Sequence, residues 1–327
     1  MITMKDIANL AGVSAATVSK IINGNDKYIS EDTRERVKRV IRETNYVPNA
    51  VAKGLKIKQS RTLGFILPDI SNPYFPEIAR GIEDAAGSLG FSVMFCNTDN
   101  DVNREAEAIS FLQSKMVDGI IVTRTAPESR LAEYSKNETP FVVVDSKSSM
   151  SKDDVGEVVI DSKAAFEDVT KLMIEKGCKK LAFISASGEY DRERYEGFLK
   201  ALKECGIKTD ESLVYRENYD VKTGYDGVNR IYKNNFPDGI VCGNDLIAVG
   251  VIDALRKKGI SVPADVKVSG FDDIYFSRYL NPALTTVKQP AYEMGVVAAK
   301  MLINFILNSE PLHSIKFPYQ LIEREST

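Results

Sequence analysis

"AGVSAATVSKIINGN", residues 11–25, is the stretch that decides how the N-terminal part of this 327-residue chain folds. Its residues are small and polar, and none of those from Ser14 to Thr17 is bulky. A helix buried in a core needs bulky apolar residues there, and a helix exposed to water usually carries more charge. A slim helix face with hydroxyl groups is suited to lie against a flat polar surface.

The residues on either side of this stretch predict two neighbouring helices. Apolar residues recur at helical spacing from Met4 to Ala11, Thr3 is a suitable N-cap, and Gly12 can take the positive φ that ends a helix. Ser14 is expected to cap the second helix, and the third helix is expected to begin after Ser30. The residues expected to face inward on the second and third helices are Val18, Ile21, Ile22, Val37, Val40 and Ile41.

Together these elements have the layout of a helix-turn-helix unit. The second helix of such a unit enters the major groove of DNA, so its outer face must be slim and able to form hydrogen bonds. On composition alone, an ordinary helical hairpin with a polar surface remains the alternative.

The charge of the chain is distributed unevenly. From Met1 to Arg61 there are twelve Lys and Arg residues against six Asp and Glu residues, a net charge of +6. The remainder carries 31 basic against 40 acidic residues, a net charge of −9. A basic N-terminal part on an acidic body suggests that the N-terminal part binds a polyanion.

Two longer segments, "MKDIANLAGVSAATVSKIIN" and "ISEDTRERVKRVIRETNYVPNAVAKGL", resemble the DNA-binding head and hinge of lactose-repressor-type (LacI/GalR) transcriptional regulators. The resemblance implies a function, namely sequence-specific binding of a double-stranded DNA operator. It places the base-reading positions on Ala15, Ala16 and Lys20, and the phosphate-facing or supporting positions on Ser14, Thr17, Ser19 and Asn23.

Lys20 departs from the pattern of the family, which usually has Arg at this position. A lysine can reach guanine acceptors but lacks the planar fork that binds them with two hydrogen bonds. Ala15 and Ala16 offer only apolar contact, which suits thymine methyl groups. The resemblance therefore leaves the operator sequence open.

Residues 48–60 are expected to form a hinge. Pro48 is expected to stop the third helix, and Gly54 weakens any short helix that follows. A plain flexible linker is the alternative. The resemblance implies instead a helix that forms on DNA, pairs with its twin in a dimer and inserts Leu55 into the minor groove, with Ala52 and Lys53 beside it.

From Thr62 onward, buried strands alternate with helices, which predicts parallel sheets covered by helices on both faces. The pattern occurs twice. "ARGIEDAAGSLGF" aligns with "YEGFLKALKECGI", which puts Gly81 in register with Gly197 and Gly90 with Gly206, and "DGIIV" returns as "DGIVC". Two such units form two doubly wound lobes that would clamp a small molecule at the strand ends. This agrees with the type I periplasmic-binding-protein-like body of the family, in which the chain crosses between lobes three times.

The expected domains follow from these patterns. They are a helix-turn-helix head at 1–47, the hinge at 48–60, and an effector-binding and dimerisation domain at 61–327. Lobe 1 is expected at about 61–160 and 291–318, and lobe 2 at about 161–290 and 319–327.

The resemblance also implies effector-contacting residues at the ends of strands. They are Tyr74, Phe75, Asp145, Arg194, Tyr219, Asn244 and Asp272. Three of them have a plainer interpretation: Arg194 as a surface charge, Asp272 as a turn residue and Tyr219 as a packing residue.

Several classes of protein are disfavoured. No apolar run reaches transmembrane length, and charges interrupt the N-terminus where a signal peptide is apolar, so we expect a cytoplasmic protein. The four cysteines form no C-x-x-C pair, and His313 is the single histidine. No catalytic constellation or glycine-rich phosphate loop is present, so we expect no enzyme, no cofactor and no metal. The final residues contain no leucine heptads, which favours a homodimer over a tetramer.

The sequence therefore favours a ligand-responsive transcriptional regulator, most simply a repressor of a bacterial carbohydrate-utilisation operon that binds a palindromic operator as a dimer. A sugar or sugar derivative is the family default for the effector. The alternatives are a regulator that depends on a purine or a protein co-repressor, and a sugar-binding protein without a DNA role.

Overall fold

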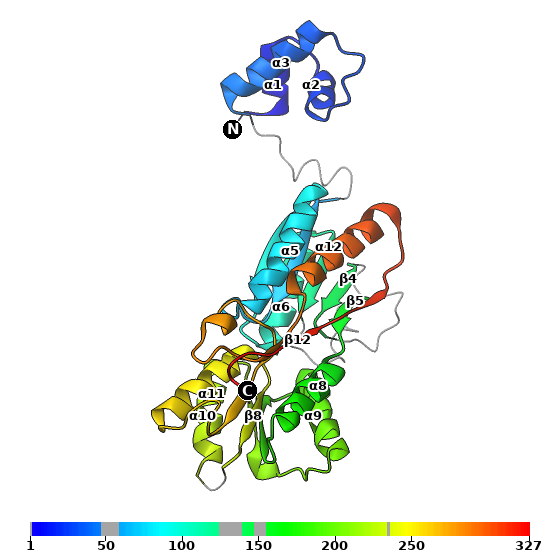
Figure 1. The fold of residues 1–327 in the computed structure, drawn as a ribbon. Helices are drawn as coiled ribbons and strands as arrows, with labels where there is room; N and C mark the ends of the chain where they lie inside the picture. Colours follow the sequence, from blue (N-terminus) through cyan, green and yellow to red (C-terminus); the bar gives the residue numbers. More distant parts are fainter. Residues whose placement is uncertain (1, 47–58, 124–138, 147–154, 234–235) are drawn as a thin grey trace. The chain divides into compact units, whose positions relative to one another are not determined.

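The computed structural model describes residues 2–46, 59–123, 139–146, 155–233 and 236–327 (Figure 1). The chain divides into two compact units, residues 1–60, here called the head, and residues 61–327, here called the body. The predicted hinge lies outside the described residues except for its last two positions, so Ala52, Lys53 and Leu55 keep the status of predictions.

The described part of the head contains three helices: α1 (Met4–Ala11), α2 (Ala15–Ile22) and α3 (Glu31–Thr44). Thr3 caps α1 as predicted, in a reciprocal capping box with Asp6. Gly12 ends α1 with a φ of 62°, a left-handed conformation that costs glycine little. Ser14 caps α2 as predicted, because its Oγ accepts the N–H of Thr17 at 3.1 Å.

The apolar side chains of the three helices meet in one small core. It consists of Ile7, Ala8, Ala11, Val18, Ile21, Val37 and Val40. Ile22 and Ile41, which were predicted to be buried, pack against this core but are only partly buried. The prediction that Pro48 ends α3 was wrong: α3 ends at Thr44 because Asn45 takes the left-handed conformation with a φ of 48°.

Lobe 1 of the body is built on a six-stranded parallel sheet in the order β11-β5-β4-β3-β1-β2. Helices α5 and α12 pack on one face of the sheet and α6 packs on the other (Figure 1). Its elements are β1 (Thr62–Leu67), α5 (Tyr74–Ser88), β2 (Ser92–Asn97), α6 (Val102–Ser114), β3 (Gly119–Thr123), β4 (Phe141–Val144), β5 (Val155–Ile160), α12 (Ala291–Asn308) and β11 (Ser314–Phe317).

Lobe 2 is built on a four-stranded parallel sheet in the order β7-β6-β8-β9. Helices α8 and α9 cover one face and α10 and α11 cover the other (Figure 1). Its elements are α8 (Ser162–Glu175), β6 (Leu181–Ala186), α9 (Arg192–Glu204), β7 (Val214–Glu217), α10 (Val221–Ile231), β8 (Gly239–Cys242), α11 (Asp245–Lys257) and β9 (Lys267–Ser269). A short antiparallel pair, β10 (Thr286–Lys288) with β12 (Gln320–Ile322), completes the body.

The duplication predicted from the sequence is confirmed by equivalent contacts in the two lobes. A Cβ atom at Gly81 would collide with the carbonyl oxygen of Tyr292, where α5 crosses α12, and one at Gly197 would collide with that of Lys163, where α9 crosses α8. Asp118 and its counterpart Asp238 also match, because each carboxylate accepts backbone N–H groups just before the first strand of its lobe.

No helix in the described part of the chain combines the length and the apolar character that crossing a membrane requires.

Candidate functional site

The outer face of α2 carries the predicted DNA-contacting residues of the head. Four of these residues are exposed, namely Ser14, Ala16, Lys20 and Asn23. Ala16 and Lys20, two of the predicted base-reading residues, are thus exposed. The exposed face is therefore slim, as the sequence predicts, and Lys20 is the one long cationic side chain on it.

The other three predicted contacts on α2, Ala15, Thr17 and Ser19, are half-buried. Ala15 packs against the head core, so only part of its methyl group can reach a base. The Thr17 hydroxyl lies 3.0 Å from that of Ser14, and Asn23 Nδ2 donates to the carbonyl oxygen of Ser19 at 2.7 Å. These polar groups hold the helix ends, which suits a supporting role.

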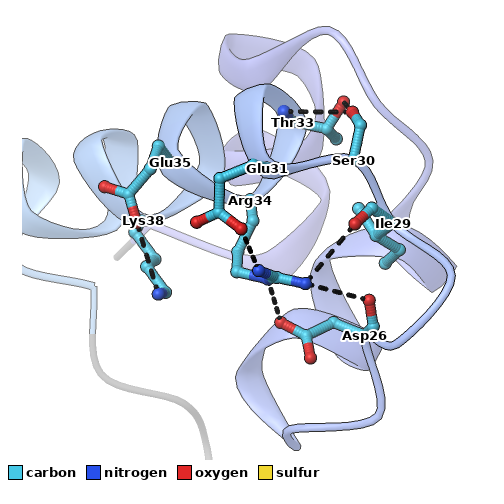
Figure 2. A network of polar contacts seen from close by, with 8 residues as sticks. All are labelled: Asp26, Ile29, Ser30, Glu31, Thr33, Arg34, Glu35 and Lys38. Carbon is cyan, nitrogen blue, oxygen red and sulfur yellow. Dashed lines mark hydrogen bonds and ion pairs between the residues drawn. The ribbon is translucent and has the colours of Figure 1, made fainter.

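Arg34 of α3 anchors the turn that follows α2, a role that the sequence alone did not reveal (Figure 2). Its Nε donates to Asp26 Oδ2 at 2.7 Å, and its Nη2 donates to the carbonyl oxygens of Asp26 at 3.3 Å and Ile29 at 3.4 Å. A further ion pair joins it to Glu31. One guanidinium therefore fixes the path of the chain between the second and third helices.

A cavity in the body brings together all seven residues that were predicted to contact an effector. Its volume is about 620 Å³, including space open to solvent. The lining consists of Pro68, Asp69, Asn72, Tyr74, Phe75, Asn100, Thr123, Asp145, Ser146, Arg194, Tyr219, Asn244 and Asp272. Residues of both lobes contribute, as expected for the crevice at the carboxyl ends of parallel strands. We call this cavity the pocket.

Arg194 is buried in the wall of the pocket, which excludes the interpretation as a surface charge. Its Nη1 donates to the carbonyl oxygen of Gly243 at 2.6 Å. Its guanidinium lies 4.8 Å from the ring centre of Tyr219 and 4.6 Å from that of Phe271. Burial by itself lowers the pKa of Arg194, but Tyr219, Asp145 and other nearby acidic groups outweigh burial and raise it. Arg194 therefore stays positively charged.

Two carboxylates, Asp145 and Asp272, face Arg194. Burial raises the pKa of Asp145, and it raises the pKa of Asp272 well above the usual range, although Arg194 opposes both shifts. At Asp145 the nearest nitrogen of Arg194 is 3.9 Å away, so Arg194 opposes burial through its charge and not through a direct hydrogen bond. The pocket thus holds carboxylates whose charge is poorly compensated.

Tyr219 and Asn244 already use part of their binding capacity within the protein. One face of the Tyr219 ring lies against Arg194, and the Tyr219 hydroxyl donates to the buried Asp191 at 2.7 Å. Asn244 Oδ1 accepts the N–H of Ile247 at 2.9 Å and caps α11. The lining also contains the aromatic ring of Phe75, and Asn244 Nδ2 is a donor.

Four buried polar atoms at the pocket have no hydrogen-bond partner among the residues that the structure describes. They are Tyr74 Oη, Thr123 Oγ1, Asp145 Oδ1 and Ser146 Oγ. The hydroxyl of Tyr74 faces Asp145 closely enough to affect its pKa without reaching hydrogen-bond geometry. Buried polar groups without partners are rare in folded proteins, so this cluster indicates a site that a polar ligand completes.

Gln289 is a second residue that the sequence did not reveal. Its buried Nε2 donates to Asp272 Oδ1 at 2.9 Å, and it also lies next to Asp145. Gln289 follows β10, just before the chain enters α12 of lobe 1. The side chain thus lies between carboxylates from the two lobes. No pattern in the sequence around Gln289 indicates these contacts.

Comparisons with known families agree with this architecture. The family described as "Periplasmic binding proteins and sugar binding domain of LacI family" matches residues 60–325, and "Bacterial regulatory proteins, lacI family" matches residues 3–49. The second of these descriptions names regulatory proteins.

Individual proteins also match over nearly the whole chain. The HTH-type transcriptional regulator RegA of Clostridium saccharobutylicum is 40% identical over 99% of each chain. A complex of the transcriptional regulator CelR with cellobiose is 26% identical, covers 100% of both chains and has a TM-score of 0.75. A lac repressor dimer bound to operator and the anti-inducer ONPF shares the fold, with a TM-score of 0.87, 24% identity, and coverage of 99% of this chain and 98% of that one. The chain therefore belongs to the LacI family of bacterial regulatory proteins.

Proposed function

We propose that this regulator is a repressor whose affinity for a palindromic DNA operator is controlled by a small polar effector bound in the pocket. The helix-turn-helix domain at 1–47 reads the operator, the hinge at 48–60 presents Leu55 to the minor groove, and the domain at 61–327 binds the effector and forms the homodimer. The protein acts in the bacterial cytoplasm, where the chromosome lies, and we assign it no catalytic step.

The exposed face of α2 supports the DNA-binding role. Ala16 offers a methyl group and Lys20 an ammonium group, which suit thymine and guanine respectively. Ser14, Thr17, Ser19 and Asn23 support the helix ends or face phosphates. The net charge of +6 on residues 1–61 attracts the phosphate backbone.

The unpartnered polar atoms of the pocket carry the proposal for the effector. Tyr74, Thr123 and Ser146 present hydroxyl groups that can donate or accept, and Asp145 presents an acceptor. Opposite them Arg194, Asn244 and Asp272 supply further donors and acceptors from lobe 2. A ligand with several hydroxyl groups satisfies such a mixed set.

The charge of the lining favours a neutral effector. Among the described residues that line the pocket there is one guanidinium, Arg194, and there are three carboxylates, Asp69, Asp145 and Asp272. Burial already raises the pKa values of Asp145 and Asp272, so the pocket disfavours negative charge, and the charge of a phosphate group would be disfavoured there in the same way. A sugar or sugar derivative without phosphate fits this lining, in line with the cellobiose complex of the related CelR.

A purine effector is the second candidate, because an aromatic ring could stack on Phe75. The structure supports a purine less well than a sugar. A purine held between two aromatic rings would need a free face on Tyr219 as well as on Phe75, and one face of Tyr219 already lies against Arg194.

Two measurements test the proposal. Gel shifts with genomic DNA of the source organism should give retarded fragments that contain a palindrome. Melting temperatures in a panel of sugars, sugar phosphates and purines should rise with a neutral sugar, because a ligand at 100 times its Kd adds about 2.7 kcal/mol. The effector found should then change the gel shift. A rise with sugar phosphates alone would overturn the neutral class, and an effect of a protein fraction alone would favour a protein co-repressor.

A further inference from the structure

The turn that carries Asp272 has a strained backbone. Asp272 has a φ of 111° and Asp273 a φ of 54°, and both values lie in regions that L-amino acids rarely adopt. Such conformations persist only where the surrounding structure holds them, and they cluster at functional sites. Asp272 lines the pocket, so the strain occurs where the direction of a carboxylate matters.

Asp245, which does not line the pocket, holds this turn from the side of α11. It is fully buried, and each of its carboxylate oxygens accepts hydrogen bonds. Oδ2 accepts the backbone N–H of Ile274 at 2.9 Å and the hydroxyl of Ser277 at 2.5 Å. Oδ1 accepts the hydroxyl of Thr286 at 2.6 Å.

Backbone hydrogen bonds fix the other side of the turn. The N–H of Asp245 donates to the carbonyl oxygen of Phe271 at 2.8 Å, and the N–H of Asp272 donates to that of Val287 at 2.8 Å. The residues immediately before and after the strained pair are therefore both bonded to Asp245. Asn244, the residue before Asp245, also lines the pocket. Asp245 is therefore linked to two residues of the lining, to Asn244 through the chain and to Asp272 through the turn.

We infer that Asp245 is a positioning residue, whose hydrogen bonds hold the turn from Phe271 to Ser277 so that Asp272 points into the pocket. The inference rests on the proposed function of the pocket. The carboxylate does not touch the effector. It acts through the backbone of the turn, and its acceptor geometry, not its charge, does the positioning.

The far end of the turn provides a place to observe it. Tyr275 is 63% exposed and Phe276 is 55% exposed, and the chain contains no tryptophan. Tyr275→Trp therefore introduces a single tryptophan on this segment, at a position where the larger ring is exposed to solvent. Its emission and its quenching by acrylamide report whether the turn is fixed, with no need for a ligand.

The variants are Asp245→Ala, Asp245→Asn and Asp253→Ala, each in the full-length chain with and without Tyr275→Trp. Alanine removes all three side-chain hydrogen bonds. Asparagine keeps an acceptor for Ile274 and Ser277, and its amide can donate to the hydroxyl of Thr286. Asp253 is the control, because it lies on the same helix as a partly exposed residue paired with Arg256 and Lys257.

Amide hydrogen exchange of residues 271–279 is compared with exchange of α10 in the same sample. We expect Asp245→Ala to accelerate exchange of the turn at least tenfold more than that of α10, and to raise acrylamide quenching, while Asp245→Asn restores both and Asp253→Ala changes neither. Equal acceleration of both segments, or an unchanged turn, overturns the inference. If Asp245→Ala does not fold, Ser277→Ala, which removes one of the three bonds, must show the same selective effect to a smaller degree.

Cellobiose is the probe for the pocket. If wild-type protein binds it, Asp245→Ala should weaken binding at least tenfold and Asp245→Asn should restore it, and unchanged affinity in the alanine variant overturns the inference. Absence of cellobiose binding to the wild type bears on the proposed effector class alone, because hydrogen exchange decides the role of Asp245 without a ligand.

Discussion

Arg194 of lobe 2 and Asp145 of lobe 1 face each other across the pocket, with Nη2 3.9 Å from Oδ2. The distance leaves an attraction between the lobes without a direct hydrogen bond. A ligand hydroxyl placed between the two groups can accept from Arg194 and donate to Asp145. Ligand binding thus strengthens a link between the lobes that is already partly formed.

Replacement of Arg194 should therefore weaken effector binding strongly. Charge-assisted hydrogen bonds contribute about 1.5–3 kcal/mol each, so Arg194→Ala should lower affinity roughly ten- to a hundredfold. Operator affinity without effector should not change. Calorimetry with the identified effector measures the effect, and Arg192→Ala on the same helix, where the side chain is 67% exposed, is the control. Full affinity and full response in Arg194→Ala would show that the residue serves only packing.

The stability of the body should respond to pH through Asp245. Burial raises the pKa of Asp245 to about 6, although hydrogen bonds from Ser277 and Thr286 and from the backbone of Ile274 oppose the shift. The folded state then binds a proton more tightly than the unfolded chain, so this residue adds stability as pH falls from 7 toward 4 and the gain is lost as pH rises through 6. The contribution is about 3 kcal/mol at most.

Asp245→Asn should remove this contribution. Urea unfolding followed by circular dichroism at several pH values between 4 and 7 gives the comparison, with Asp253→Asn on the same helix as control. Identical pH dependence in the wild type and Asp245→Asn would contradict the raised pKa.

Operator binding should weaken steeply with salt. The net charge of +6 on residues 1–61 is present twice in a dimer. If six or more phosphates are contacted, affinity should fall roughly 10³-fold between 50 and 200 mM salt, because each contact releases condensed counterions. Fluorescence anisotropy with a labelled operator measures the slope. A nearly flat slope would mean that phosphate contacts do not dominate.

Lys20→Ala should relax the choice of base at one operator position, at a cost of about 1–3 kcal/mol per half-site. The reason is that Lys20 is the long cationic side chain on the exposed face of α2. Binding to a set of operators mutated at single positions gives the profile, and Lys5→Ala, an exposed lysine of α1, is the control. If Lys20→Ala lowers affinity equally for every operator sequence, Lys20 contacts a phosphate and not a base.

Arg34→Ala should loosen the turn after α2, since it removes the bonds to Asp26 and Ile29 that Figure 2 shows. We expect weaker operator binding and faster amide exchange in residues 24–30, both larger than the effects of Lys38→Ala, whose side chain pairs with Glu35 on the surface of α3. Effects of similar size in the two variants would show that Arg34 does not fix the turn and acts only as a charged surface residue.

Local features of this fold could be predicted from the sequence. The caps at Thr3 and Ser14 and the turn at Gly12 depend on chemistry within a few residues, which a sequence displays directly. The register of the duplicated lobes was also predictable, because Gly81 and Gly197 mark equivalent helix crossings.

Contacts between distant segments were not predictable from the residues alone. The pocket residues were predicted through a family resemblance, which indicates their positions in the sequence but not the groups that they contact. Tyr219 lies against Arg194, and Gln289 donates to Asp272, because folding brings segments together that no periodicity connects. The end of α3 was mispredicted because an asparagine can take the left-handed conformation before the nearest proline acts.

The crossing of α5 and α12 limits the mechanics of lobe 1. Besides Gly81 against the carbonyl of Tyr292, Gly295 of α12 lies against the carbonyl of Ile78, so each helix fits its backbone into the other. Sliding along the shared axis would drive main chain into main chain. Shear between these two helices is therefore opposed, so we expect α5 and α12 to move together as one rigid unit.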